Sequence, residues 1–404
     1  MLGWELPPYN SGGLGVACYH LAKALASHGA DIDFILPHRA EHDQPTVMTV
    51  KTALLEDRQP SLSIETLPSA YTGSCAACRE GARACPHVDI TDIRELQRLY
   101  VEYIDDYTRT EKPTVIHAHD WLTLEAGVRA KEISGAPLIA HVHATEFDRV
   151  AHGFGNPLIH EIEQHGLLSA DQIITVSEAT KQVIVKRYGI PANKIDVIHN
   201  STEKLDTNIL DAHLYTYLST MQQEGYLVVA TIGRLTVQKG LTYFLHAAAE
   251  ASARYERFIF VIAGDGDQRD ELIALSAELG IADKVIFTGF VRGKAWRDVY
   301  SLADVFVMSS VSEPFGLTAL EAAQHDTAIA LTKQSGVGEV LSSVLRYDYW
   351  DTTRLADQLV NLATTESLRD ELAQDVAIEL SHMSWGKVAT RFIEQYERLR
   401  VVTT

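Results

Sequence analysis

Short apolar runs recur along the chain and alternate with longer segments whose apolar residues have helical spacing. The clearest runs lie at residues 32–36, 137–142, 226–232, 258–263 and 305–308. Continuous apolar runs of this length are typical of strands that a parallel sheet buries on both faces, because helices cover each side. The alternation of strand and helix therefore predicts an α/β fold built on doubly wound parallel sheets.

This alternation occurs twice, and a polar segment with poor periodicity separates the two sets at residues 201 to about 224. A chain of 404 residues also exceeds what one ordinary hydrophobic core accommodates. We therefore predict an N-terminal domain at residues 1–205 and a C-terminal domain at residues 206–384. A last helix follows at residues 385–404, and the pattern alone leaves open whether it simply caps the second domain.

The charge balance excludes some classes of partner. The formal net charge is -19, and such a field repels nucleic acids and anionic membranes. No stretch approaches the roughly 20 apolar residues that span a bilayer, and the N-terminus lacks the basic start and apolar run of a signal peptide. We therefore expect a cytoplasmic protein without an integral membrane segment.

Three of the four cysteines lie close together in the sequence. Cys75 and Cys78 are followed by Cys85 and His87, which gives four soft ligands, the number that a structural zinc ion requires. The spacing is irregular for a known zinc finger. Two interpretations therefore remain open, a zinc site and a reduced, metal-free loop.

The strand at 305–308 leads through a turn into a helix that carries two carboxylates. Glu313 lies in the turn, and Glu321 follows about two helical turns later. Free backbone N–H groups at residues 316–318 open the helix and suit an anionic ligand. This arrangement predicts a site for a sugar, with its hydroxyls on carboxylates and its phosphate on amides. The alternative is a plain strand–turn–helix whose glutamates are solvated.

The motif Glu313-Pro-Phe-Gly-Leu317, with Glu321 eight positions after the first glutamate, resembles the signature of retaining glycosyltransferases. The similarity is to enzymes of the two-domain GT-B fold, particularly family 4 and the bacterial glycogen and starch synthases. It implies two Rossmann-like domains that face each other across a cleft. It also implies that Glu313 lies by the donor sugar, that Glu321 binds the ribose hydroxyls, and that the donor contacts Phe315, Gly316 and Leu317.

A second motif, Gly233-Arg-Leu followed by Gln238-Lys-Gly240, resembles the loop that grips the donor diphosphate in GT-B enzymes. Arg234 offers a planar fork and Lys239 a point charge, and together they can neutralise a departing diphosphate. In a chain with so large an excess of acids, we prefer this role to that of solvated surface charge.

In the first domain, Gly12 and Gly13 precede a helix and would let backbone approach the donor phosphates. A lone glycine loop is weak evidence, and it could equally be a plain turn. The families resembled have a complete strand before this loop. Residues 1–4 are too short for one, so the strand is abbreviated here or begins upstream.

Polar residues also follow the later strands of the first domain. His143 comes directly after the strand at 137–142, where open parallel sheets bind ligands, and it matches a family histidine that faces the sugar. The resemblance places Asp120 on the acceptor side, although Asp120 could instead be the N-cap of the next helix. Asn200 is a further candidate acceptor contact.

Taken together, the resemblance implies a retaining, metal-independent hexosyltransferase that needs no cofactor. The donor would be ADP-glucose or UDP-glucose, the acceptor a glucan, and the catalytic residues Glu313, His143, Arg234 and Lys239. In the resembled fold the last helix crosses back onto the first domain, and we therefore expect residues 385–404 to pack on residues 1–205. Alternatives are a family 4 enzyme with a small or lipid-linked acceptor, a nucleotide-sugar 2-epimerase, and a nonenzymatic nucleotide-sugar sensor.

Overall fold

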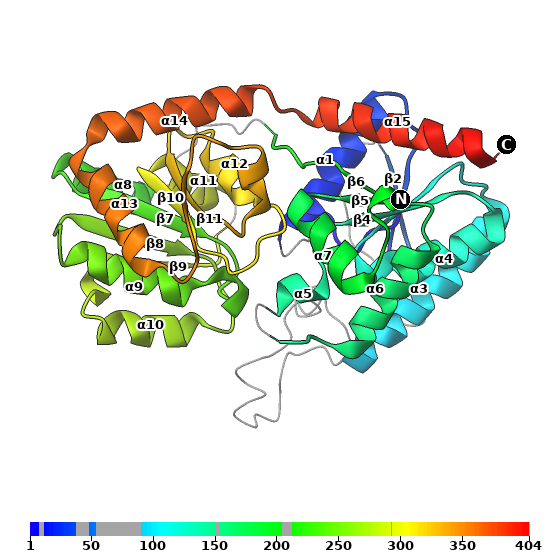
Figure 1. Ribbon diagram of the computed structural model, residues 1–404, viewed down its shortest axis with the longest axis horizontal. Coiled ribbons are helices and arrows are strands. Elements are labelled where there is room, and N and C mark those ends of the chain that lie inside the picture. The colour runs from blue at the N-terminus through cyan, green and yellow to red at the C-terminus, as the bar shows by residue number, and fades with distance from the viewer. Residues whose placement is uncertain are drawn as a thin grey trace. The chain divides into compact units, whose positions relative to one another are not determined.

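The structure is a computed structural model (Figure 1) that describes residues 1–7, 12–37, 48–53, 90–150, 153–203, 212–291 and 293–403. It contains two compact units. Unit 1 comprises Met1–Ser201 together with Ser384–Thr404, and unit 2 comprises Thr202–Met383. The predicted zinc ligands Cys75, Cys78, Cys85 and His87 lie outside the described residues, so that prediction stays open.

Unit 2 is built on a six-stranded parallel sheet in the order β12-β11-β10-β7-β8-β9. The strands are β7 (Leu227–Ile232), β8 (Phe258–Ala263), β9 (Val285–Gly289), β10 (Val305–Met308), β11 (Ala328–Thr332) and β12 (Leu345–Tyr347). Its helices are α8 (Ala212–Gln223), α9 (Leu241–Ser252), α10 (Arg269–Glu278), α11 (Gly293–Ser301), α12 (Leu317–Ala322), α13 (Thr352–Thr364) and α14 (Glu366–Ser381), with short 3-10 helices η3 (Val237–Lys239), η4 (Ala282–Lys284) and η5 (Gly336–Glu339).

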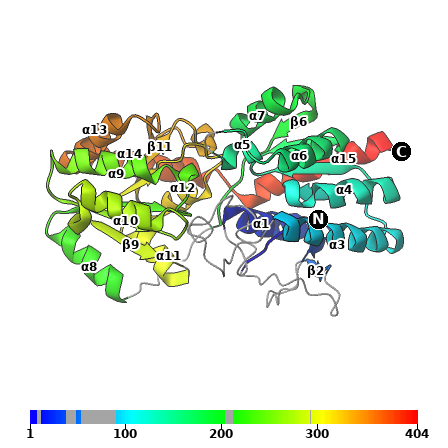
Figure 2. The same cartoon turned by 90° about the horizontal axis from the view of Figure 1, so that it is seen from below.

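Apolar residues cover both faces of this sheet, as the unbroken apolar runs predict. Along β7, Leu227 and Val229 pack into a cluster with α9, α10 and α13, whereas Val228 and Ala230 pack against α8 and α11. Successive side chains of a strand point to opposite faces, so each strand serves both clusters. Figure 2 shows these helices around the sheet.

Helix α8 corrects the sequence prediction for residues 201–224, which we expected to be a linker without regular structure. Leu218 on this helix is fully buried, and Tyr215 and Met221 pack against the same cluster. These residues are three positions apart and form one narrow apolar stripe. Because the residues around this stripe are polar, the segment as a whole shows little helical periodicity in the sequence.

Unit 1 contains a four-stranded parallel sheet in the order β3-β4-β5-β6 and a parallel pair, β1-β2. The strands are β1 (Asp33–Leu36), β2 (Thr49–Thr52), β3 (Ile116–His119), β4 (Leu138–Val142), β5 (Gln172–Thr175) and β6 (Ile195–Val197). Its helices are α1 (Gly13–Ser27), α3 (Ile90–Thr110), α4 (Trp121–Ser134), α5 (Glu146–Arg149), α6 (Pro157–Ser169), α7 (Glu178–Tyr188), the 3-10 helix η2 (Ala192–Lys194) and α15 (Trp385–Thr403).

Leu2 links the two pieces of sheet. It forms single parallel bridges with Ile35 of β1 and Ala118 of β3, and its N–H donates to the His117 carbonyl at 2.8 Å. The first residues thus occupy the position of a short strand between β1 and β3.

Helix α15 packs onto unit 1 rather than capping unit 2. Trp385 stacks on His20 of α1, Phe392 is fully buried, and Gln395 Nε2 donates to Asp196 at 2.9 Å. Among the helices of the described ranges, none is both long and apolar enough to cross a bilayer.

Candidate active site

A small, partly open pocket lies in unit 2 beside the carboxyl ends of β7 and β10. These neighbouring strands mark the point where the strand order reverses, because the chain continues from β7 outward to β8 and returns on the other side. Open α/β sheets bind ligands at this switch point. The lining includes residues of both predicted motifs: Thr231, Ile232, Gly233, Arg234, Leu235, Lys239, Leu241, Ile262, Ala263, Phe306, Val307, Met308, Ser309, Ser310, Glu313 and Thr318.

An ion pair between Lys239 and Glu313 lies in this pocket. Lys239 Nζ is 2.5 Å from Glu313 Oε2, and Ser310 Oγ donates to the same oxygen at 2.9 Å. The backbone of Glu313 is fixed on both sides, since its N–H donates to the Gln334 carbonyl and its carbonyl accepts from Gly336. The side chains are 21% and 12% exposed, so a ligand in the pocket can reach both.

The loop that carries Lys239 is attached to the strand end that carries Glu313. Ser309 Oγ donates to the Lys239 carbonyl at 2.8 Å, and Val311 N–H donates to the Gln238 carbonyl at 2.8 Å. Gly240 has a φ of 62°, and a Cβ at that position would lie 2.2 Å from the Ser309 oxygen. Only glycine permits this approach of the two segments.

The second predicted carboxylate, Glu321, has a different environment. It lies on α12 and accepts a hydrogen bond of 2.8 Å from the Tyr300 hydroxyl. Burial raises the pKa of Glu321 to about 7. Thr318 lines the pocket, whereas Glu321 is not among the lining residues.

The turn before α12 places the remaining predicted donor contacts. Gly316 has a φ of 112° and occupies the N-cap position, so α12 begins at Leu317 as expected. Phe315 is buried, and its carbonyl accepts from Val337 N–H at 2.7 Å.

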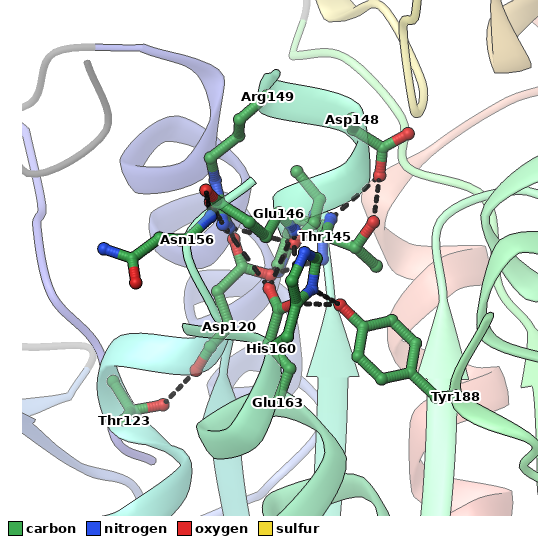
Figure 3. Close-up of polar contacts among 12 residues, drawn as sticks. Asp120, Thr123, Thr145, Glu146, Asp148, Arg149, Asn156, His160, Glu163 and Tyr188 are labelled. Carbon is green, nitrogen blue, oxygen red and sulfur yellow. Dashed lines mark hydrogen bonds and ion pairs between the residues drawn. The ribbon is translucent and has the colours of Figure 1, made fainter. Parts of the chain in front are cut away.

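In unit 1, Asp120 follows β3 and supports the backbone after β4 (Figure 3). Its Oδ1 accepts from the N–H groups of His143 at 2.7 Å and Ala144 at 3.3 Å, and Arg149 lies 4.0 Å from its other oxygen. Burial raises the pKa of Asp120 to about 6. Asp120 occupies the N-cap position of α4, but its side chain makes no capping hydrogen bond.

His143 is half-buried at the end of β4, and its Nε2 lies 3.0 Å from Nδ1 of His119. Burial lowers the pKa of His143 to about 3, so the imidazole is neutral at physiological pH. A neutral ring can donate through one nitrogen and accept through the other. Asn200, which follows β6, is buried.

Gly12 and Gly13 are exposed at the beginning of α1. The nearby N–H of Gly15 donates to Glu5 Oε1 at 3.2 Å. A carboxylate of the protein therefore already satisfies one of the amides at this helix N-terminus, a contact that the glycine pattern does not reveal.

Sequence reasoning missed a buried network around Arg149 (Figure 3). Arg149 Nη1 lies 3.3 Å from Glu146 and 3.4 Å from Glu163, and the Tyr188 hydroxyl also donates to Glu163. Burial raises the pKa of Glu163 to about 7. The spacing of Glu146 and Arg149 on one short helix was the one visible signal, because Glu163 and Tyr188 join only through the fold.

Comparisons with known proteins bear on both units. The model of the family described as Glycosyltransferase Family 4 matches residues 11–203, and the model described as Glycosyl transferases group 1 matches residues 219–371. A glycosyltransferase of Methanocaldococcus jannaschii named as uncharacterized is 30% identical over 346 residues, which cover 84% of this chain and 82% of that protein. A glycogen synthase of Mycobacterium tuberculosis is 26% identical over 344 residues, which cover 84% of this chain and 79% of that protein.

A solved structure supports the fold. The crystal structure of Anabaena HepE in complex with UDP and glucose superposes with a TM-score of 0.71 at 17% identity, and the match covers 98% of each chain. At that identity the likeness concerns the fold alone. The parallel sheets of both units, the two matched family models and the archaeal relative lead to one conclusion: the chain belongs to the family 4 glycosyltransferases and has the GT-B fold.

Proposed function

We propose that this glycosyltransferase moves glucose, or a similar hexose, from a nucleotide diphosphate sugar to a glucan acceptor with retention of the α configuration. The proposal rests mainly on the ion pair between Lys239 and Glu313, which lies in a pocket that Arg234 also lines. The glycogen synthase relative and the HepE complex with UDP and glucose support the choice of acceptor and donor.

The pair at 2.5 Å can exchange partners when the donor enters. Lys239 would turn from Glu313 to the diphosphate, where Arg234 adds a second cation. Glu313 would then accept hydrogen bonds from the sugar hydroxyls. Each charge keeps a partner of opposite polarity throughout, so the exchange avoids leaving a buried charge unpaired.

Front-face attack then follows. The acceptor hydroxyl oxygen bonds to C1 of the sugar on the side from which the diphosphate leaves, and the electron pair of the breaking C1–O bond goes to the diphosphate. A diphosphate oxygen takes the hydroxyl proton. Lys239 and Arg234 stabilise the developing negative charge, which is the task that a divalent ion would otherwise perform, so we propose that no metal is required.

The other predicted residues take supporting roles in this proposal. Neutral His143 exchanges hydrogen bonds with a sugar hydroxyl, and Asp120 is a positioning residue because its carboxylate holds the His143 backbone. Glu321 accepts from the ribose hydroxyls. Gly12 and Gly13 approach the donor phosphates, and Asn200 contacts the acceptor.

The decisive assay measures nucleoside diphosphate release from ADP-glucose and from UDP-glucose, with and without glycogen or maltooligosaccharide. We expect release that depends on the glucan and persists in a chelator, with an α linkage in the product by NMR. Release that ignores the glucan would reject the proposed acceptor and favour a small acceptor or an epimerase. A β linkage would reject retention.

A further inference from the structure

Histidines gather on one face of the sheet in unit 1. His117 and His119 belong to β3, while His141 lies on β4 and His143 directly follows it. His119 pairs with His141 across the two strands, and alternate residues of a strand share a face. The rings of His141 and His143 are 4.1 Å apart between centroids. Helix α1 brings Cys18 to the same place.

The atoms of three of these side chains are spaced almost as metal ligands are. Cys18 Sγ and one ring nitrogen each from His119 and His143 all lie within 4.8 Å of one another, and His119 Nδ1 is 3.0 Å from His143 Nε2. A tetrahedral zinc ion, with bonds of about 2.0–2.3 Å, places its ligand atoms about 3.3–3.6 Å apart. Side-chain shifts of about 1 Å would therefore form the site.

A further observation points to a cation. Cys18 is a free, buried thiol, and the carboxylates of Glu5 and Asp120 lie near enough to interact electrostatically with it. Acidic neighbours favour a positive ion over an anion.

We propose that Cys18, His119 and His143 form a binding site for a borderline-soft divalent transition metal, with Zn²⁺ as the best-fitting ion. One thiolate and two imidazoles suit zinc, whereas Mg²⁺ and Ca²⁺ prefer oxygen ligands. Three protein ligands leave a fourth position open. His143 is the half-buried member of the set, so the ion enters and takes its fourth ligand from that side.

A bound ion has a consequence for activity that rests on the proposed role of His143. Metal coordination fixes the imidazole that would otherwise meet the sugar, so zinc acts as an inhibitor rather than a cofactor. Binding releases the Cys18 thiol proton to solvent. Both imidazoles bind in the neutral form, so the proton held between His119 and His143 moves to the nitrogen of its own ring that does not bind the ion.

Cobalt provides a readout that does not depend on turnover. Co²⁺ is titrated into the full chain carrying Cys75→Ser, Cys78→Ser and Cys85→Ser, which removes the other thiols that could bind it. We expect one Co²⁺ per chain, a thiolate-to-cobalt charge-transfer band, visible bands of the intensity typical of four-coordination, and loss of all of them on addition of Zn²⁺.

Variants assign the ligands. In that background, Cys18→Ala should abolish the charge-transfer band, and His143→Ala should weaken Zn²⁺ binding by at least about tenfold. His165→Ala, at an exposed position on α6, should change neither. A charge-transfer band that survives Cys18→Ala, or no thiolate band in the parent, overturns the site. If Cys18→Ala does not fold, the comparison of His143→Ala with His165→Ala decides alone.

The activity arm separates the two proposals. Zinc should suppress nucleoside diphosphate release by the parent, and Cys18→Ala should remove that sensitivity. Zinc that binds in the cobalt competition but leaves release unchanged would uphold the metal site and overturn the role of His143. Absence of any catalytic release, with intact cobalt binding, would overturn the proposed function alone.

Discussion

Each unit places a basic side chain among carboxylates, but the two arrangements differ in burial and stoichiometry. In unit 2, Lys239 is 21% exposed, pairs with Glu313 and lines a pocket. In unit 1, the Arg149 side chain is 8% exposed and lies within 4.0 Å of the carboxylates of Asp120, Glu146 and Glu163.

This difference in burial suits the two groups to different roles, one binding substrate and the other stabilising the fold. A partly exposed one-to-one pair can exchange partners with a charged ligand at small cost. A buried cation shared by several acids cannot leave, because each acid would then be an uncompensated buried charge. We infer that the Lys239 pair meets substrate, whereas the Arg149 network holds the shape of the loop that carries His143.

The largest effect should come from the recognition pair. Lys239→Ala should lower nucleoside diphosphate release on the order of 10³-fold, because the leaving group loses a cation, while the variant should remain folded. The control is Lys333→Ala, which breaks the exposed pair with Asp348 in the same unit. Unchanged turnover in Lys239→Ala would remove the distinction between the two networks.

The support network should respond in the opposite way. Arg149→Met should destabilise the protein by about 3 kcal/mol in urea unfolding, because it leaves buried acids without their cation. Arg254→Met, which breaks an exposed pair with Asp357, should cost about 0.5 kcal/mol or less. Equal costs for the two variants would show that burial does not set the difference.

The attachment of the Lys239 loop can be tested at glycine. Gly240→Ala should cost about 2–3 kcal/mol and lower turnover, since the new methyl group meets the Ser309 carbonyl. Gly280 has a similar φ of 71° with nothing within 4 Å, so Gly280→Ala should cost about 1 kcal/mol and leave turnover intact. Matching losses of turnover in the two variants would contradict this assignment.

The smallest effect concerns Glu321, whose pKa rises from 4.5 to about 7 on folding. Between these pH values the folded state binds more protons than the unfolded state, so the free energy of unfolding falls as pH rises. Glu321→Gln should remove this part of the slope and be more stable than the parent at pH 8 by about 1–2 kcal/mol. Urea unfolding at pH 5 and pH 8 measures the free energy of unfolding of both proteins. If the parent and Glu321→Gln showed the same change between these pH values, the raised pKa of Glu321 would be contradicted.

The fold was largely readable from sequence because its strands are continuous apolar runs, and GT-B family membership followed from the motifs around Lys239 and Glu313. Helix α8 was missed because its apolar stripe is one residue wide. The Arg149 network and the Cys18, His119 and His143 cluster were missed for another reason: their members come from distant segments, and only strand register and helix packing bring them together.

The sequence also gave no sign of how Asp120 is used. An aspartate after a strand and before a helix fits both a ligand contact and a cap, and its carboxylate instead accepts from the backbone after the neighbouring strand. Adjacent parallel strands end at the same edge of a sheet, but which loop turns toward which side chain depends on packing that no local pattern records.

The return of α15 to unit 1 has a consequence for the order of synthesis. Phe392 fills the core face beside His117, and the Tyr396 hydroxyl lies 2.7 Å from that ring. Unit 1 therefore cannot complete its core on the ribosome until nearly the whole chain has been translated, whereas unit 2 is encoded without interruption and can finish first. The half of the protein that is made first is the half that matures last.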